Sequence, residues 1–361
     1  MNPALEIGWN LVLAAAEIGF LARGRATSTP AVRISSRLGF VWIFAMAFAL
    51  PIAQEGFAAM RLWAWGIFVH GPLLCVVIAI LSKGRSRAAV AAFSVAAVLV
   101  IAVGIDAFFI EPKRLDVEHI RLTSAKLKAP IRIAILADIQ TDDVGEHERR
   151  AVRAAMAEKP DLVLLCGDYI EEEDDAKRRT QHENLRRLFL EESLTAPLGV
   201  FAVEGDNDWG DWLDIYAGLP VRASRETFDA QIGAVALKGL SLRDSRRADL
   251  AVAPASSFQI VFGHAPDFSL GNVQADLLVA GHTHGGQVQI PGFGPIITLT
   301  RAPRDHAAGG AHDLGGGRTL IVSRGIGMER GSAPLLRFWC APHIVIVDIV
   351  PETDQRGATS K

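Results

Sequence analysis

The sequence contains little cysteine and no excess of positive charge, and both absences narrow its possible functions. Its three cysteines, Cys75, Cys166 and Cys340, show no paired spacing, which excludes a disulfide framework and a zinc-thiolate site. Lysine and arginine total 37 against 40 aspartate and glutamate residues, for a net charge of −3. Because a nucleic-acid-binding surface needs clustered excess basic residues, we do not expect nucleic acid as a partner.

Long apolar runs, in contrast, fill the first third of the chain. Half of the 361 residues are hydrophobic, and the mean hydropathy of +0.25 is too high for an ordinary soluble enzyme. Residues 1–112 hold four apolar stretches, Leu5–Leu21, Leu38–Met60, Leu62–Leu81 and Ala88–Ile110. The last three are long enough to cross a bilayer. We therefore predict a transmembrane region of three to four helices over residues 1–112.

The first stretch differs from the others because it carries polar side chains. Glu6, Asn10 and Glu17 fall on one helical face, which either packs against neighbouring helices or lies at the membrane interface. Glu17, His70 and Asp106 are costly in lipid, so they should face the bundle interior, as a proton or ion path or as polar groups satisfied between helices. Pro72 predicts a kink.

Basic residues are unequally divided between the loops that connect these stretches. The loops before the second and fourth stretches hold Arg23, Arg25, Arg33, Arg37, Lys83, Arg85 and Arg87, whereas the turn between the second and third holds only Arg61. The positive-inside rule makes the two basic loops cytoplasmic. We predict a multi-pass inner (plasma) membrane protein whose C-terminal domain is extracytoplasmic. Lys113 and Arg114 argue weakly for the opposite orientation.

From about Ile131 the pattern changes to short apolar runs that alternate with helical stretches near Glu146–Glu158 and Ala176–Glu192. This alternation is typical of a layered α/β fold with ligands at the carboxyl ends of the strands. We expect two packed sheets within a domain spanning 113–350, followed by a disordered tail, 351–361. The acidic run Glu171–Asp175 is interpreted as a solvated helix start without a chemical role.

Polar residues that bind metals follow five of the apolar runs. The strands expected at 131–137, 162–166, 200–203, 258–262 and 277–280 lead to Asp138 and Gln140, Asp168, Asp206 and Asn207, His264, and finally His282 and His284. Alternate residues of an extended chain point the same way, so His282 and His284 can face one small volume. Aspartate is a common helix cap, but histidine is not, which indicates a metal site.

This order of motifs resembles the calcineurin-like metallophosphoesterase superfamily. The run Gly281-His282-Thr283-His284-Gly285-Gly286-Gln287, with Ser323–Gly327 and Arg337-Phe338, is similar to the membrane-attached bacterial branch of that superfamily. The resemblance covers roughly residues 130–350. It implies a two-sheet β-sandwich flanked by helices, with two divalent metal ions at one end of the sheets.

The resemblance also implies the ligand set. One metal ion is held by Asp138, Gln140, Asp168 and His284, and the other by Asp168, Asp206, His264 and His282, so that Asp168 bridges them. Catalytic roles fall to Asp168, Asn207 and His264. A hydroxide between the ions attacks phosphorus in line with the leaving oxygen.

Three positions depart from the family pattern. Gln140 replaces a histidine, Asp206 an asparagine, and Asn207 the histidine that assists the phosphate and the leaving group. The harder oxygen ligands favour Mn²⁺ or Fe²⁺, with Mg²⁺ or Zn²⁺ as alternatives. Asn207 cannot deliver a proton, which favours phosphoanhydrides or other good leaving groups, unless Asp208 or His306 acts as the acid. In an alternative register, Asn207 supplies the metal amide.

Two functions follow from these patterns. The first is a membrane-anchored metal-dependent phosphohydrolase that cleaves phosphate esters or phosphoanhydrides, with an envelope or lipid-linked substrate as one option. The second is a catalytically silent binding or sensing module that keeps the same fold. Trp209 and Trp212 are expected either to rim the substrate cleft or membrane surface, or simply to pack.

Overall fold

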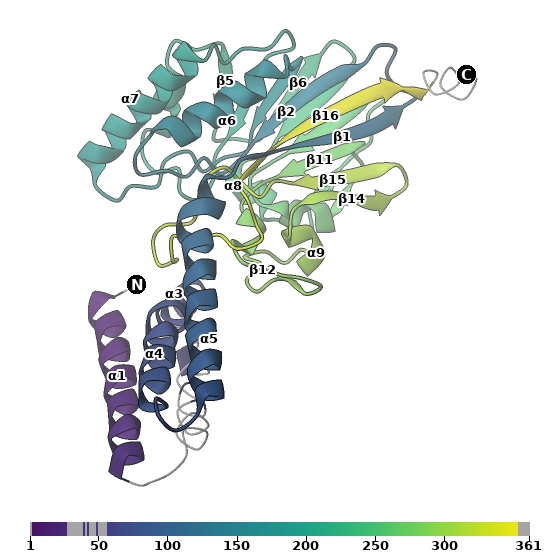
Figure 1. Cartoon of the computed structure of the whole chain (residues 1–361). Coiled ribbons are helices and arrows are strands. Elements are labelled where there is room, and N and C mark those ends of the chain that lie inside the picture. The colour runs from purple at the N-terminus through teal and green to yellow at the C-terminus, as the bar shows by residue number, and fades with distance from the viewer. Residues whose placement is uncertain (1, 27–38, 40–41, 43–47, 50–55, 353–361) are drawn as a thin grey trace. The chain divides into compact units, whose positions relative to one another are not determined.

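The computed structural model describes residues 2–26, 39, 42, 48–49 and 56–352, and these form two compact units (Figure 1). One unit consists of Met1–Ile110 together with the loop Glu329–Leu335, and the other holds the rest of the chain. The second unit contains two six-stranded sheets, as the alternation of strands and helices predicted.

The first sheet has the strand order β1-β16-β2-β3-β4-β5. Its strands are β1 (Asp116–Ser124), β2 (Ile131–Leu136), β3 (Leu162–Leu165), β4 (Val200–Val203), β5 (Val221–Ser224) and β16 (His343–Pro351). Strands β2 to β5 are parallel, so the loops that follow β2, β3 and β4 leave the sheet at the same end. Strand β16 is antiparallel to β2 and parallel to β1.

The second sheet has the strand order β14-β15-β11-β9-β7-β6. Its strands are β6 (Phe228–Ile232), β7 (Val235–Gly239), β9 (Phe258–Phe262), β11 (Leu277–Ala280), β14 (Gly310–Gly315) and β15 (Arg318–Val322). Two short two-stranded sheets are separate from it. One pairs β8 (Ala251–Val252) with β10 (Asn272–Val273), and the other pairs β12 (Gln289–Ile290) with β13 (Gly294–Pro295). Strands β9, β11 and β15 are parallel, which directs the loops after β9 and β11 to one end.

The two sheets pack face to face through a fully buried apolar core. Ile133 and Ile135 of β2 lie in one cluster with Ile260 of β9 and Val279 of β11. Helices α6 (Glu146–Ala157) and α7 (Asp175–Glu191) cover the outer face of the first sheet (Figure 1). Shorter segments lie elsewhere in this unit: η3 (Glu111–Lys113), η4 (Trp212–Tyr216), α8 (Leu242–Ser245), η5 (Pro266–Leu270), η6 (His284–Gly286) and α9 (Arg304–Ala307).

Strand β1 was not predicted, because it carries polar and apolar side chains alternately and lies at the edge of its sheet. It reads Asp-Val-Glu-His-Ile-Arg-Leu-Thr-Ser, which lacks the continuous apolar run that marks the buried strands. At the other end of the domain, β16 includes Pro351, so the predicted tail begins no earlier than Glu352. Residues 353–361 of that tail lie outside the described residues.

The described residues of the N-terminal unit that precede Glu111 are mostly helical. They form α1 (Pro3–Ala26), α3 (Gly56–Trp65), the π-helical turn η1 (Gly66–His70), α4 (Gly71–Leu81), α5 (Arg87–Ile105) and the π-helical turn η2 (Asp106–Ile110). Two continuous helical segments, Gly56–Leu81 and Arg87–Lys113, are long and apolar enough to cross a membrane. Most of the predicted second stretch, Leu38–Met60, falls outside the described residues. The predicted turn at Arg61 is wrong, because Arg61 lies inside α3.

The polar side chains of this unit contact one another. His70 lies between Glu17 and Asn10, with Nδ1 at 3.0 Å from Glu17 Oε2 and Nε2 at 3.1 Å from Asn10 Oδ1. The polar face of α1 therefore packs against its neighbours, one of the two alternatives that its sequence allowed. Pro72 lacks an N–H, and the preceding turn widens to a π-helix in which the Gly71 N–H bonds to the Gly66 carbonyl.

Candidate metal centre

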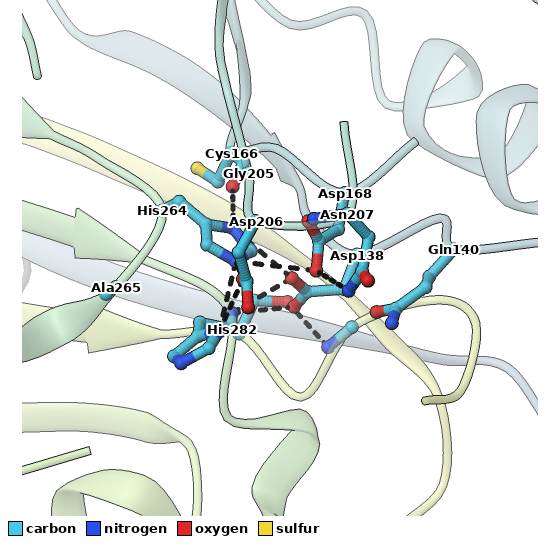
Figure 2. A network of polar contacts seen from close by, with 12 residues as sticks. Asp138, Gln140, Cys166, Asp168, Gly205, Asp206, Asn207, His264, Ala265 and His282 are labelled. Carbon is cyan, nitrogen blue, oxygen red and sulfur yellow. Dashed lines mark hydrogen bonds and ion pairs between the residues drawn. The ribbon is translucent and has the colours of Figure 1, made fainter. Parts of the chain in front are cut away.

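Five loops bring the predicted ligands to one end of the sandwich. The loops follow β2, β3, β4, β9 and β11, and the side chains that they carry form two adjoining clusters. Figure 2 shows five of these side chains close together: Asp138, Asp168, Asp206, His264 and His282. One cluster contains Asp168, Asp206, His264 and His282, and the other contains Asp138, Asp168 and His284. In each cluster one donor atom per residue lies within 4.8 Å of the others. Asp168 belongs to both clusters, at the position from which a carboxylate can bridge two ions.

In the first cluster the imidazoles converge on Asp206. His264 Nε2 lies 2.7 Å and His282 Nδ1 3.0 Å from Asp206 Oδ1, and His264 Nε2 lies 3.4 Å from Asp168 Oδ2. On its other side, His264 Nδ1 is 2.8 Å from the Cys166 carbonyl oxygen. A bond from Nδ1–H to a carbonyl fixes the tautomer in which Nε2 is the free ligand, as in most metal-bound histidines.

The second cluster contains an imidazole without hydrogen bonds. His284 is fully buried, and neither ring nitrogen has a hydrogen-bond partner among the described residues. Burial, with the nearby Arg337 guanidinium, holds its pKa well below the usual value, so the ring is neutral. A buried polar group without a partner is costly. A metal ion near Asp138 and Asp168 would satisfy this ring, so the residues present fit a divalent cation.

Gln140 is held in place by a residue to which the sequence assigned no role. Its Nε2 donates to Glu171 Oε2 at 2.9 Å in a buried contact. This bond anchors the amide nitrogen, while the amide end of the side chain is directed toward the carboxylate clusters (Figure 2). Glu171 is 8 % exposed, so the interpretation of Glu171–Asp175 as fully solvated is wrong at this residue. Helix α7 begins only at Asp175.

The loop after β4 gives Asp206 and Asn207 different partners. Asp206 contacts His264 and His282, whereas the Asn207 side chain lies against the bridging residue, with Nδ2 at 3.0 Å from Asp168 Oδ2. The geometry therefore puts the Asp206 carboxylate among the metal-ligand candidates. The Asn207 backbone N–H also donates to Asp168 Oδ1 at 2.8 Å.

Asp208 does not have the geometry of a substitute acid. Its carboxylate is buried and accepts three backbone N–H groups, those of Asp168, Tyr169 and Gly205, at 2.7 to 2.8 Å. It therefore joins the loops after β3 and β4. Trp212 is also structural, because it is fully buried and its ring stacks on Tyr169.

Charge is concentrated in this small volume. Burial raises the pKa of Asp138 to about 7, and the negative charge of Asp168 adds to that effect. Burial also acts to raise the pKa of Asp206, but hydrogen bonds from His264 and His282 outweigh it and hold the pKa far below the usual range. Burial acts to lower the pKa of His264, yet the surrounding carboxylates raise it well above normal. Without metals, protons on Asp138 and His264 offset the negative charge of this site, and bound cations would replace them.

Five of the seven predicted ligands have left-handed backbone conformations. The φ angles are +49° at Asp138, +35° at Gln140, +55° at Asp168, +70° at His282 and +48° at His284. Such conformations are uncommon in residues other than glycine and accumulate at functional sites. They also correct one step of the sequence argument, because His282 and His284 are not in an extended chain. Their side chains enter different clusters.

Glycines next to the ligands permit close approach of the loops. A Cβ atom on Gly205 would lie 2.2 Å from Asp168 Oδ1, and one on Gly281 would lie 2.7 Å from Asp138 Oδ2. Any larger residue at these positions must displace a ligand. Gly205, after β4, and Gly281, which opens the histidine motif Gly281–Gln287, therefore make room for carboxylates of neighbouring loops.

Sequence reasoning missed Arg246, which borders the centre. Its Nη2 lies 2.9 Å from Asp206 Oδ2, and its side chain is 47 % exposed. Arg246 stands in a polar loop after α8, where no motif distinguishes it from Arg247. Arg337, by contrast, is buried, and its guanidinium donates to the carbonyls of Arg324, Gly327 and Cys340. His306 belongs to neither cluster of the centre.

Comparison with known proteins identifies the family to which this domain belongs. The model of the calcineurin-like phosphoesterase domain matches residues 131–286. An uncharacterized metallophosphoesterase, YkuE of Bacillus subtilis, is 30 % identical over 203 residues, which cover 52 % of this chain and 67 % of YkuE. The chain belongs to the calcineurin-like metallophosphoesterase family. The expected superfamily is thereby confirmed. Its members use divalent metals, and this chain has the Asp and His clusters that could hold them.

Two further relatives extend the match. The phosphodiesterase YaeI of Escherichia coli is 27 % identical over 239 residues, covering 62 % of this chain and 83 % of YaeI. An uncharacterized metallophosphoesterase of Aquifex aeolicus is 25 % identical over 254 residues, covering 65 % of this chain and 92 % of that protein. Membership in this family supports hydrolysis of phosphoester bonds as the general activity.

Proposed function

We propose that this metallophosphoesterase hydrolyses phosphodiesters or phosphoanhydrides with good leaving groups, using two divalent ions held by Asp138, Gln140, Asp168, Asp206, His264, His282 and His284. The observation that carries the proposal is the pair of ligand clusters that share Asp168. Two divalent ions at such a site polarise the phosphoryl group and supply a hydroxide nucleophile near neutral pH. Mn²⁺ or Fe²⁺ suits the mixed oxygen and imidazole donors.

The protein's own residues perform three tasks in this scheme. Asp168 would hold both ions, and the backbone and side-chain N–H groups of Asn207 keep its carboxylate in place. The Cys166 carbonyl orients His264, so that Nε2 faces the centre. Arg246, at the exposed edge, offers a guanidinium to the phosphate.

The side chains of Asn207 and Asp208 determine which leaving groups the site can expel. Asn207 can donate a hydrogen bond but has no proton to give up near neutral pH. Asp208 is engaged by three backbone N–H groups. An alkoxide therefore leaves without an acid, whereas an aryloxide or a phosphate needs little help. The name of the relative YaeI, a phosphodiesterase, supports a diester among the substrates.

We place the activity at the membrane, with the catalytic domain outside the cytoplasm. The two apolar helical segments and the distribution of basic residues before the second and fourth apolar stretches support this placement. It makes an envelope or lipid-linked phosphate the substrate class within easiest reach. A periplasmic reporter fused after Lys361 should be active, and a cytoplasmic reporter at the same position inactive. The reverse result would refute the orientation.

The activity is tested with full-length protein in detergent, stripped of metal and reloaded with Mn²⁺. We expect hydrolysis of bis(4-nitrophenyl) phosphate and of a nucleoside diphosphate derivative, with two ions per chain by elemental analysis. Asp168→Asn should abolish both activity and paired metal binding, whereas Asp142→Asn, in the loop beyond Gln140, should change neither. Fewer than one ion per chain, with no activity for any divalent ion, would instead identify a silent binding or sensing module.

A further inference from the structure

A second group of metal-binding side chains lies outside the centre described above. Asp305 and His306 belong to α9, and His312 belongs to β14, which α9 contacts (Figure 1). One donor atom from each of the three lies within 4.8 Å of the others. The two imidazole rings are 4.6 Å apart between centroids, with an interplanar angle of 36°. Neither the family match nor the fold requires such a group.

The nitrogen atoms of this group lack partners. His306 Nδ1 and His312 Nε2 are buried, and neither has a hydrogen-bond partner among the residues that the structure describes. His312 makes a backbone hydrogen bond with Gly309 through its ring. Histidines that bind metals commonly use the second ring nitrogen in this way, so that the first nitrogen faces the ion. Two imidazoles that each keep a buried nitrogen without a partner, in one group with a carboxylate, match what a cation requires of its ligands.

We propose that Asp305, His306 and His312 bind a third divalent transition-metal ion, with Zn²⁺ as the best match. Two imidazoles and one carboxylate form a donor set that Zn²⁺ accepts in tetrahedral geometry, with one position left for water or another ligand. Asp305 is exposed and lines a cavity of about 590 Å³ together with Arg304, Phe293 and Trp339. Asp305 thus connects this group with the cavity, from which an ion can enter.

An ion at this position would immobilise the segment from Gln289 to Ala308, which contacts the main metal centre. Gln289 Nε2 donates to the Ala308 carbonyl, at the end of α9, at 2.8 Å, and to the Gly285 carbonyl, in the histidine motif, at 3.1 Å. In the same segment, the Leu299 carbonyl lies 3.2 Å from His282 Nε2. The third ion would thus hold α9 against β14 and stiffen the segment between the two histidine groups. Its role is structural, and the ion takes no part in hydrolysis.

The test measures zinc bound per chain in full-length protein that has been stripped with a chelator and reloaded. The double variant His306→Gln/His312→Gln should bind one ion fewer than its parent, both in the natural chain and in the Asp168→Asn background. The difference between each variant and its parent does not depend on how many ions the main centre holds. His119→Gln, which alters an exposed histidine paired with Glu158, is the matched control and should keep the parent's count.

Two readouts keep the test decisive if the double variant folds poorly. Asp305→Asn alters an exposed side chain and should raise the zinc dissociation constant of this site at least tenfold in chelator competition. Zinc should also raise the thermal unfolding temperature of the Asp168→Asn protein, but not that of the protein that carries all three substitutions. Equal zinc counts in variant and parent, or an unchanged dissociation constant in Asp305→Asn, would overturn the third site.

Discussion

Arg246 offers the sharpest test of the charge balance at the metal centre. Asp138, Asp168 and Asp206 carry three negative charges against the four positive charges of two divalent ions, which leaves one positive charge for the phosphate. Arg246, at 2.9 Å from Asp206 Oδ2, restores the second. Arg246→Gln removes that charge and a charge-assisted hydrogen bond, which is worth about 1.5–3 kcal/mol. The 47 % exposure of the side chain favours the lower end of this range.

The expected result is therefore a KM for bis(4-nitrophenyl) phosphate that rises roughly tenfold, since about 1.4 kcal/mol corresponds to a factor of ten. The inhibition constant of inorganic phosphate should rise by a similar factor, and both effects should shrink at high salt. The kcat should change little, because the two ions remain. Steady-state kinetics and elemental analysis on Mn²⁺-loaded protein measure all of these quantities.

Arg247 supplies the control, because it is the next residue and is similarly exposed. Its guanidinium pairs with Asp244 and Asp249, both outside the centre. Arg247→Gln should leave KM and metal content unchanged. An equal rise of KM in both variants would mean that Arg246 contributes only to the overall surface charge and does not bind the phosphate. Loss of metal in Arg246→Gln with KM unchanged would mean that Arg246 only positions Asp206, and the charge argument would fail.

Three further predictions follow from the same geometry. Asn207→His should raise hydrolysis of alkyl phosphodiesters at least tenfold relative to aryl diesters, because it supplies a general acid, and a constant ratio of the two rates would refute that assignment. Gly281→Ala pushes a methyl group against Asp138 and should cost about 1–3 kcal/mol in unfolding free energy, with loss of bound metal, by thermal melts and elemental analysis. Burial lowers the pKa of His343 to about 4, while the unfolded chain takes up a proton near 6.5. The chain should therefore lose about 3 kcal/mol of stability as the pH falls from 6.5 to 4, a loss that His343→Gln should abolish in melts at each pH.

Part of this site could be predicted because strand periodicity and strand-end chemistry are local properties. Apolar runs such as Leu162–Cys166 and Leu277–Ala280 are buried on both faces, so their boundaries are visible in the sequence. In a parallel sheet the residues after such runs leave at one edge. Asp138 and Asp168, which follow neighbouring strands of one sheet, were therefore expected to lie close together. His264 follows a strand of the other sheet, so its place beside them was expected only from the family resemblance.

The tertiary structure alone assigned the remaining polar groups. Arg246 and Glu171 lie in polar segments whose composition is ordinary, and only their distances to Asp206 and Gln140 give them roles. His306 and His312 belong to separate elements and meet only because α9 folds against β14. The sequence by itself determined which strands end at the centre, because a buried strand is a continuous run of apolar residues that can be recognised locally. The structure decided which side chains touch there, because such contacts join residues far apart in the chain.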